Sequence, residues 1–289
     1  MRWTLPGSTP FSRLPLTAGL ALLVAFAAPA RAVPVVPYLE AYASASDGGG
    51  SDLQTGSGGS VSASRSGSYS GYGANRGADA SANAAFGKLA AKSSAAGTNA
   101  TGVSGAAARF RDSITITAPG VATGANGLFE FAIAVDGSMD ADNGHADWIL
   151  GFQVASFSWT TLAGGDVYND PGGSGVTGDP YGGYYTSGVW LFHFGEPFTL
   201  EMMLGTDTTA GASNGSGSAY SLFGNTLRWQ GIVQVQDYAT HAPIASYTVA
   251  SASGTDYSQP IPEPATSLLL ASGVLGLALR GRLTRAFAR

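Results

Sequence analysis

The sequence predicts an all-β fold, an antiparallel β-sandwich of the jelly-roll type, and three observations support this prediction. Short runs in which large apolar residues alternate with small or polar ones recur between residues 113 and 251, and a period of two is typical of a half-buried strand. Gly, Asp, Asn and Pro separate these runs, as they do in β-turns. No long segment before residue 265 has the 3.6-residue period of an amphipathic helix. The length of 289 residues fits one large all-β domain or two small ones.

Residues 1–32 are predicted to form a secretory signal peptide with a helical core. Two arginines precede an uncharged apolar run over residues 16–28. Ala30 and Ala32 then place small residues at the positions that a signal peptidase accepts, which predicts cleavage after Ala32. The alternative is an uncleaved anchor or an amphipathic helix, but the run is shorter than the about 20 apolar residues that span a bilayer. We therefore expect an exported chain.

Residues 43–108 form an unusual first part of the predicted domain, because Ala, Ser and Gly supply 45 of these 66 residues. One interpretation of this composition is a flexible linker. The other is a set of small-residue strands in a closely packed sheet, and the serine at every second position of 61–69 favours it. Residues 79–96 hold enough Ala for a helix, but Gly87 and the lack of an apolar stripe oppose one. We predict irregular strands joined by loops.

From residue 109 onward the sequence is rich in aromatic residues and has clear strand patterns. Alternation is strongest over 113–117, 129–135 and 198–202. Further predicted strands cover 148–159, 189–194, 225–236 and 246–251. The small-residue part is expected to provide the face on which this aromatic part packs. Residues 33–257 would then form one extracytoplasmic domain, followed by a short linker, 258–261.

An acidic stretch over residues 136–147 is the first candidate binding site. Calcium takes six to eight oxygen ligands, which Asp and Asn on a turn supply. The candidate ligands are Asp140, Asp142 and Asn143. Their spacing departs from that of an EF-hand, since the glycine falls one position early and no glutamate closes the loop. The simpler interpretation is a solvated hairpin loop between strands that end near Val135 and begin near Trp148.

An aromatic segment is the second candidate site. Residues 163–183 are predicted to form a long Gly-rich loop with several acidic and amide side chains. Exposed aromatic rings beside such groups stack on sugar faces and bind sugar hydroxyls. The candidate carbohydrate-binding residues are Tyr181, Tyr184, Tyr185 and Trp190. The alternative is an aromatic cluster that covers a sheet edge.

Composition and spacing disfavour several kinds of chemistry. The absence of cysteine excludes thiol catalysis, disulfides and Cys-ligated metals. His145, His193 and His241 lack the spacing of a zinc motif, and the sequence has no G-x-S-x-G nucleophile elbow. Glu130 and Glu201 are candidate glycosidase carboxylates, but each stands opposite the apolar face of its strand, so a solvent-facing position is the simpler expectation. We predict a non-enzymatic protein with no cofactor apart from the candidate calcium ion.

The last 28 residues have three parts. Pro262, Glu263 and Pro264 form an extended segment that lacks two backbone donors. Residues 265–279 carry no charge and predict a transmembrane helix, which at about 1.5 Å per residue covers roughly 22 Å of the roughly 30 Å hydrocarbon core. Bilayer thinning and snorkelling basic side chains would accommodate the difference. Those basic residues, expected on the cytoplasmic side, are Arg280, Arg282, Arg285 and Arg289.

This ordered tail resembles the PEP-CTERM sorting signal of Gram-negative bacteria. The resemblance rests on the Pro-Glu-Pro segment, the apolar stretches 268–270 and 273–277, and the arginines that follow. It implies a protein that is exported, held transiently in the inner membrane and processed near the motif by an exosortase, and then reaches the cell surface or the medium. It also implies a setting of exopolysaccharide, biofilm or floc. The alternative is an ordinary C-terminal membrane anchor.

The charge of the exported part differs from that of the whole chain. Residues 33–262 contain seven basic and 18 acidic residues, a formal charge of −11, against −5 for the full sequence. Such a domain repels nucleic acid and other polyanions unless divalent cations bridge them. The expected partners are signal peptidase, exosortase and exopolysaccharide, without nucleic acid. The predicted function is an exported surface or matrix protein, and the alternative is a lectin-like polysaccharide-binding domain assisted by calcium.

Overall fold

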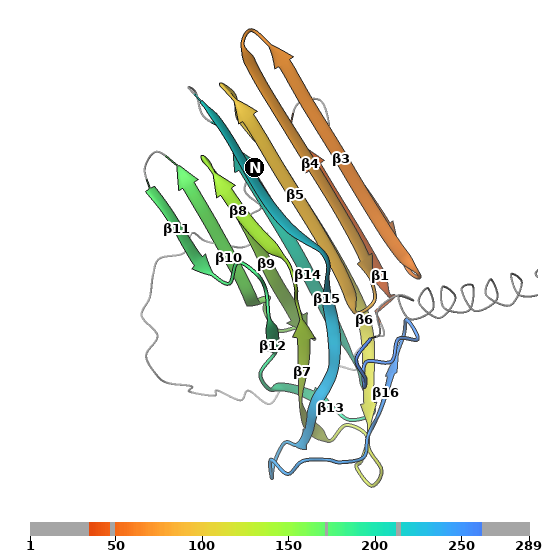
Figure 1. Ribbon diagram of the computed structural model, residues 1–289. Helices are drawn as coiled ribbons and strands as arrows, with labels where there is room; N and C mark the ends of the chain where they lie inside the picture. Colours follow the sequence, from red (N-terminus) through yellow and green to blue (C-terminus); the bar gives the residue numbers. More distant parts are fainter. Residues whose placement is uncertain (1–34, 47–49, 171–172, 212–214, 262–289) are drawn as a thin grey trace, which may run out of the picture.

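The computed structural model describes residues 35–46, 50–170, 173–211 and 215–261, where the chain consists of strands, turns and loops (Figure 1). The predicted signal helix 1–32 and transmembrane helix 265–279 lie outside these residues. Within them, no helix is long and apolar enough to cross a membrane. The strands are β1 (Tyr38–Ala45), β2 (Gly50–Gly56), β3 (Ser60–Gly71), β4 (Ala74–Ala85), β5 (Lys88–Thr98), β6 (Gly102–Thr117), β7 (Asn126–Ala134), β8 (Ser138–Asp142), β9 (Gly144–Val154), β10 (Thr160–Asp170), β11 (Gly173–Gly178), β12 (Tyr184–Thr186), β13 (Trp190–His193), β14 (Pro197–Ala210), β15 (Ser216–Asp237) and β16 (Thr248–Ser251).

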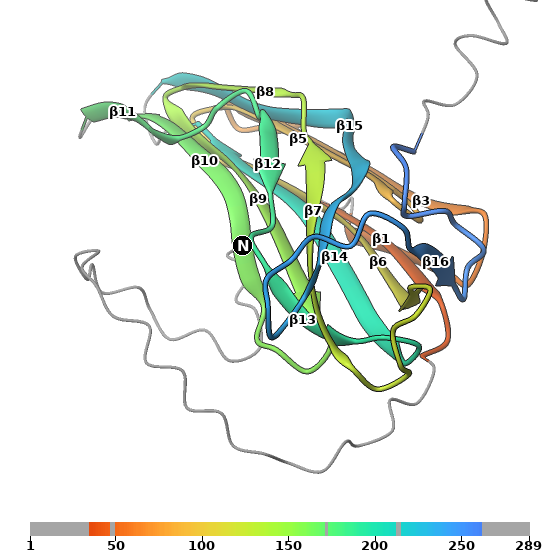
Figure 2. The same cartoon turned by 90° about the horizontal axis from the view of Figure 1, so that it is seen from below.

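The strands form two antiparallel sheets that lie face to face (Figure 2). Sheet A has the order β11-β10-β9-β14-β6-β1-β2, and β16 also pairs with β6. Sheet B has the order β12-β7-β15-β5-β4-β3, with β13 beside β7 and β8 beside β15. The predicted all-β antiparallel fold is confirmed. Most of the strands predicted from alternation are parts of longer strands, because the pairing extends into neighbouring segments whose own pattern is weak.

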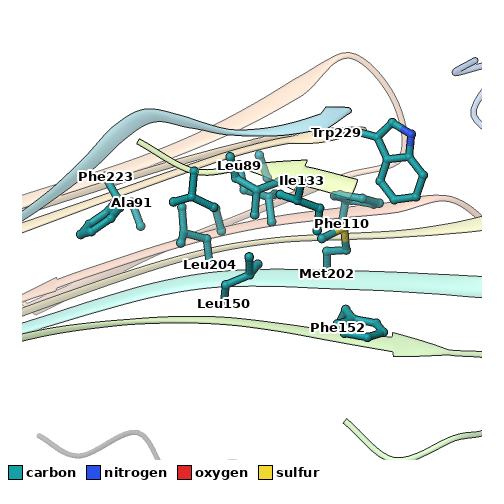
Figure 3. Packing of buried hydrophobic residues seen from close by; sticks show 14 of the residues in the cluster. Leu89, Ala91, Phe110, Ile133, Leu150, Phe152, Met202, Leu204, Phe223 and Trp229 are labelled. Atoms are coloured by element: carbon teal, nitrogen blue, oxygen red, sulfur yellow. The ribbon is translucent and has the colours of Figure 1, made fainter. Parts of the chain in front are cut away.

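Aromatic side chains fill the core between β7, β15 and sheet A (Figure 3). The Trp229 ring stacks on Phe131 at 4.8 Å between ring centroids, and Phe152 meets Phe131 edge-to-face at 5.1 Å. Trp148 of sheet A stacks on Phe223 of sheet B at 4.6 Å. All five rings are at most 2% exposed. Aromatic contacts of this geometry contribute roughly 0.5–1.5 kcal/mol each beyond the burial of their area.

Alanine fills the core at the other side of the molecule. Ala41 and Ala108 of sheet A face Ala82 and Ala84 of sheet B, and all four are nearly fully buried. Some Cα atoms of β1 lie within 8 Å of Cα atoms of β3 and β4 across the interface, closer than the roughly 10 Å that separates typical packed sheets. Only small side chains permit this approach, which explains the Ala, Ser and Gly composition of this part.

The small-residue part is more regular than its sequence predicts. β3 pairs with β4, and β4 with β5, residue by residue without a bulge. The predicted strands are confirmed, but their predicted irregularity was wrong, and so was the alternative of a flexible linker for the described residues. The Ala, Ser and Gly composition alone suggests a flexible chain, because small side chains do not shield the backbone from water. In the folded domain the neighbouring strands pair with these backbone N–H and C=O groups and so keep the segment ordered.

Two segments predicted as loops are also strands. Most of residues 163–183 belongs to β10 and β11, which pair with each other and continue sheet A beyond β9. Glycine permits this close pairing, since a Cβ at Gly164 would lie 2.9 Å from the carbonyl oxygen of Trp148. The acidic stretch 136–147 contains β8 and the start of β9, and Asn143 forms the turn between them with a φ of 52°. That turn connects sheet B to sheet A.

Candidate functional site

The predicted targeting residues lie outside the described residues. They are the signal-cleavage pair Ala30 and Ala32, the sorting residues Pro262, Glu263 and Pro264, and the basic residues Arg280, Arg282, Arg285 and Arg289. The structure describes the chain as far as Ile261, immediately before the sorting residues.

The predicted linker 258–261 packs against the domain. The backbone N–H of Ile261 donates to the carbonyl oxygen of Trp229 at 3.0 Å. The indole Nε1 of Trp229 donates to the carbonyl oxygen of Tyr257 at 2.8 Å, and Tyr257 is fully buried. The side chain of Ile261 contacts the core at Gly87. The folded domain therefore holds the chain up to the residue that precedes the Pro-Glu-Pro segment.

A buried carboxylate fastens the chain a few residues earlier, at Ser253. Asp112 of β6 is fully buried and accepts hydrogen bonds from the backbone N–H groups of Ser113 at 2.8 Å and Ser253 at 3.1 Å. The Ser253 hydroxyl also donates to this carboxylate. Burial, followed by the nearby charge of Asp112, raises the pKa of Tyr257 well above its ordinary value. Sequence reasoning missed this anchor because its partners are about 140 positions apart.

The structure divides the predicted carbohydrate-binding residues into two pairs. Tyr181 and Tyr184 are 67% and 63% exposed. Tyr185 is half-buried and donates its hydroxyl hydrogen to Asp179 Oδ2 at 2.9 Å; burial and this carboxylate raise the pKa of Tyr185. Trp190 packs edge-to-face on Phe152 at 5.1 Å. Only the first pair is exposed to solvent, whereas the second pair packs against the sheet.

The candidate calcium ligands lie on and beside β8. Asp140 and Asp142 are exposed, and Asp140 Oδ1 accepts the backbone N–H of Ala141 at 2.9 Å. The Asn143 side chain donates to the carbonyl oxygen of Ser216 at 3.0 Å, so it fastens the turn to β15. Across the described ranges, no three carboxylate or imidazole groups come together as a metal-binding cluster.

The two candidate glycosidase carboxylates lie on the outer faces of different sheets. Glu130 belongs to β7 of sheet B and Glu201 to β14 of sheet A, so they do not form a catalytic pair. The expected solvent-facing position of Glu201 was wrong, because this residue is 1% exposed. Arg109 and Arg111 of the adjacent strand cover it as ion-pair partners, the latter at 2.6 Å. The guanidinium of Arg109 also lies over the ring of Trp159, at 5.6 Å from its centroid.

The histidines remain dispersed in the fold. His145 Nε2 lies 3.1 Å from Asp166 Oδ1 on the neighbouring strand β10. His193 is half-buried at the end of β13, and His241 is exposed in the turn after β15. This arrangement brings no two histidines to one site.

A polar groove on the outer face of sheet B was not predicted. Two adjoining depressions of about 420 and 250 Å³ share Ser64, Ser81 and Lys92 in their lining. The alternating serines of β3 were a signal for it, but their sequence did not show which strands would lie beside them.

These features define an all-β domain whose core holds the chain as far as Ile261, directly before the Pro-Glu-Pro segment. Residues 260–282 match the family model described as PEP-CTERM protein-sorting motif, so the chain carries this sorting motif at its C-terminal end. The motif implies an exosortase substrate that is exported, membrane-anchored at first and then directed to the cell surface. No curated protein and no solved structure matches the chain.

Proposed function

We propose that the protein is a non-enzymatic component of the cell surface or extracellular matrix that associates with exopolysaccharide. The sorting motif carries this proposal, because it directs an exported chain to the exterior. The domain is suited to that setting, since it contains no cysteine and is stabilised by two sheets packed on one core. In this scheme signal peptidase removes residues 1–32, and residues 265–279 hold the intermediate in the inner membrane until an exosortase acts.

Intact-mass analysis of the protein released from producing cells tests the processing scheme. We expect a mass that lacks both residues 1–32 and the arginines from Arg280 to Arg289. Fractionation of the same culture tests the location: the processed protein should accumulate with the purified exopolysaccharide fraction. A protein that keeps its arginines, or that remains wholly in the cell membrane, would refute the proposal.

A lectin-like function is the second candidate, and the exposure of Tyr181 and Tyr184 favours it. Both side chains are largely exposed, and Asp179 orders the segment by accepting the backbone N–H of Tyr181 at 2.9 Å. The test is retention of the protein on immobilised exopolysaccharide, with Tyr184→Ala as the variant and Tyr184→Phe as the matched control. Loss with alanine and retention with phenylalanine would indicate ring stacking. Equal retention of all three forms would exclude this segment.

The lectin-like function includes a calcium ion that would assist sugar binding. Asp140 and Asp142 project from one face of β8 and are open to solvent, so a cation would bind there with additional oxygen ligands from water or sugar. Calorimetric titration of calcium chloride into the protein and into Asp140→Asn measures this directly. Identical heats for the two proteins would remove calcium from the proposal.

A further inference from the structure

The groove on the outer face of sheet B crosses the middle of β3, β4 and β5, which lie side by side in Figure 1. Ser64 is opposite Ser81, and Ser81 is opposite Lys92, in the registers of the two strand pairs. The residues between these positions, such as Ala80 and Ala82, are buried in the alanine core. The floor of the groove is therefore a continuous part of the sheet, held in place by the packing beneath it.

Three charged side chains line this groove: Arg65, Asp79 and Lys92. Asp79 is exposed on β4, two residues before Ser81, and Lys92 is exposed on β5. Among the described residues, neither the carboxylate nor the ammonium group has a hydrogen bond or an ion pair. Lys92 lies across Gly224 of β15, where any Cβ would overlap its stem. The fold thus leaves space for the lysine stem and keeps both charges available to a ligand.

The groove offers the chemical groups that a sugar chain requires. Serine hydroxyls donate and accept hydrogen bonds, the carboxylate accepts them and the ammonium group donates them. Leu222 is 41% exposed in the lining, and Tyr220, which is 36% exposed, lies opposite Ser94 of the lining. Apolar surface is therefore available for the C–H faces of sugar rings. The formal charge of −11 over residues 33–262 repels a polyanion at long range, and the groove lining itself has a surplus of only one positive charge, from Arg65 and Lys92 against Asp79. A neutral ligand is therefore favoured.

We propose that this groove binds an extended strand of neutral polysaccharide. The inference rests on the proposed association with exopolysaccharide and assigns it a site. Asp79 and the serines would hydrogen-bond sugar hydroxyls, Lys92 would donate from the side of β15, and Leu222 would contact a ring face. This site differs from the tyrosine pair, which lies at and beside β12, at the opposite edge of sheet B.

Affinity electrophoresis of the secreted protein, in its processed form, tests the proposal. The gels contain dextran, laminarin or hydroxyethyl cellulose as neutral probes, or polygalacturonate as an anionic one. Ser81→Trp fills the groove where its two depressions meet, and Asp79→Asn removes the carboxylate with little change in volume. Ser70→Trp is the matched control, because Ser70 is exposed on β3 outside the groove lining.

We expect retardation of the native protein in at least one neutral gel and none in polygalacturonate. Both groove variants should bind more weakly by roughly tenfold or more, as expected when a hydrogen-bonding charge is lost or the site is filled, whereas the control should bind normally. If Ser81→Trp fails to fold, Asp79→Asn decides alone. No retardation in any neutral gel, or a loss with Tyr184→Ala but not with the groove variants, would overturn the groove. Such an outcome would leave the proposed association with exopolysaccharide intact, because the fractionation experiment tests that association separately.

Discussion

Replacement of Gly87 by alanine should loosen the chain that precedes the sorting motif. Gly87 has a φ of 71°, a left-handed conformation that costs an L-residue about 1–2 kcal/mol. A Cβ there would overlap the Cδ1 atom of Ile261 and approach Trp229 Cβ to 3.3 Å. Trp229 is fully buried and cannot move easily, so Ile261 must leave. The lost burial of this partly exposed side chain adds about 1 kcal/mol, which brings the expected loss of unfolding free energy to about 2–3 kcal/mol.

The matched control for Gly87→Ala is Gly73→Ala. Gly73 has a φ of 75° and nothing within 4 Å of an added Cβ, so it measures the backbone term alone. Urea unfolding followed by tryptophan fluorescence gives both free energies, and limited proteolysis reports whether residues 255–261 become accessible. The Ile261→Ala variant lacks the side chain that must move. When Gly87→Ala is added to this variant, the further loss of unfolding free energy should be no larger than the loss caused by Gly73→Ala. Equal losses for both glycine variants in the native background would refute this account of the anchor.

Three further predictions concern the anchor, the buried ion pairs and the alanine core. Because burial raises the pKa of Tyr257, the unfolded chain releases this proton above pH about 10 while the folded chain keeps it, so stability should fall with rising pH by up to about 1.4 kcal/mol per pH unit. Tyr257→Phe should make that decline shallower in urea unfolding between pH 9 and about 11; an unchanged slope would contradict the assignment. Glu201→Gln leaves its two arginine partners without their carboxylate and should cost about 1–3 kcal/mol of unfolding free energy, a loss that Glu130→Gln should not reproduce. Ala82→Leu overpacks the narrow gap between the sheets and should cost about 1–3 kcal/mol of unfolding free energy, whereas Asn83→Leu on the exposed face should be nearly neutral. Thermal unfolding of the two variants measures this difference, and equal losses would contradict the close approach of the sheets.

Alternation was a reliable guide wherever one face of a strand is large and apolar. Phe129, Phe131 and Ile133 predicted an inward face on β7, and all three are buried. The serines of β3 also predicted an extended segment, because they recur at every second position and a period of two places identical side chains on one face of a strand. The pattern was least informative for residues 163–183, where glycine removes the contrast between the faces and only the pairing with β9 makes the segment a strand.

The candidate sites were less predictable than the strands. Tyr181, Tyr184, Tyr185 and Trp190 are close in sequence, yet alternation along the sheet directs some outward and others to the core. Glu201 had the pattern of an exposed residue, but two arginines of an adjacent strand cover it. These outcomes depend on neighbours that are distant in sequence, and the local pattern contains no information about them.

The sequence by itself determined the sorting motif, the acidity of the exported part and the alternating strands, because each of these is a local property of consecutive residues. The tertiary structure decided how the strands pair, how closely the alanine faces approach and which polar side chains share a groove. It also showed that the domain holds its own chain up to Ile261, the residue before Pro262. The physical reason is that hydrogen bonds between strands and packing between sheets join residues far apart in the chain, and their partners are fixed only when both sheets have formed.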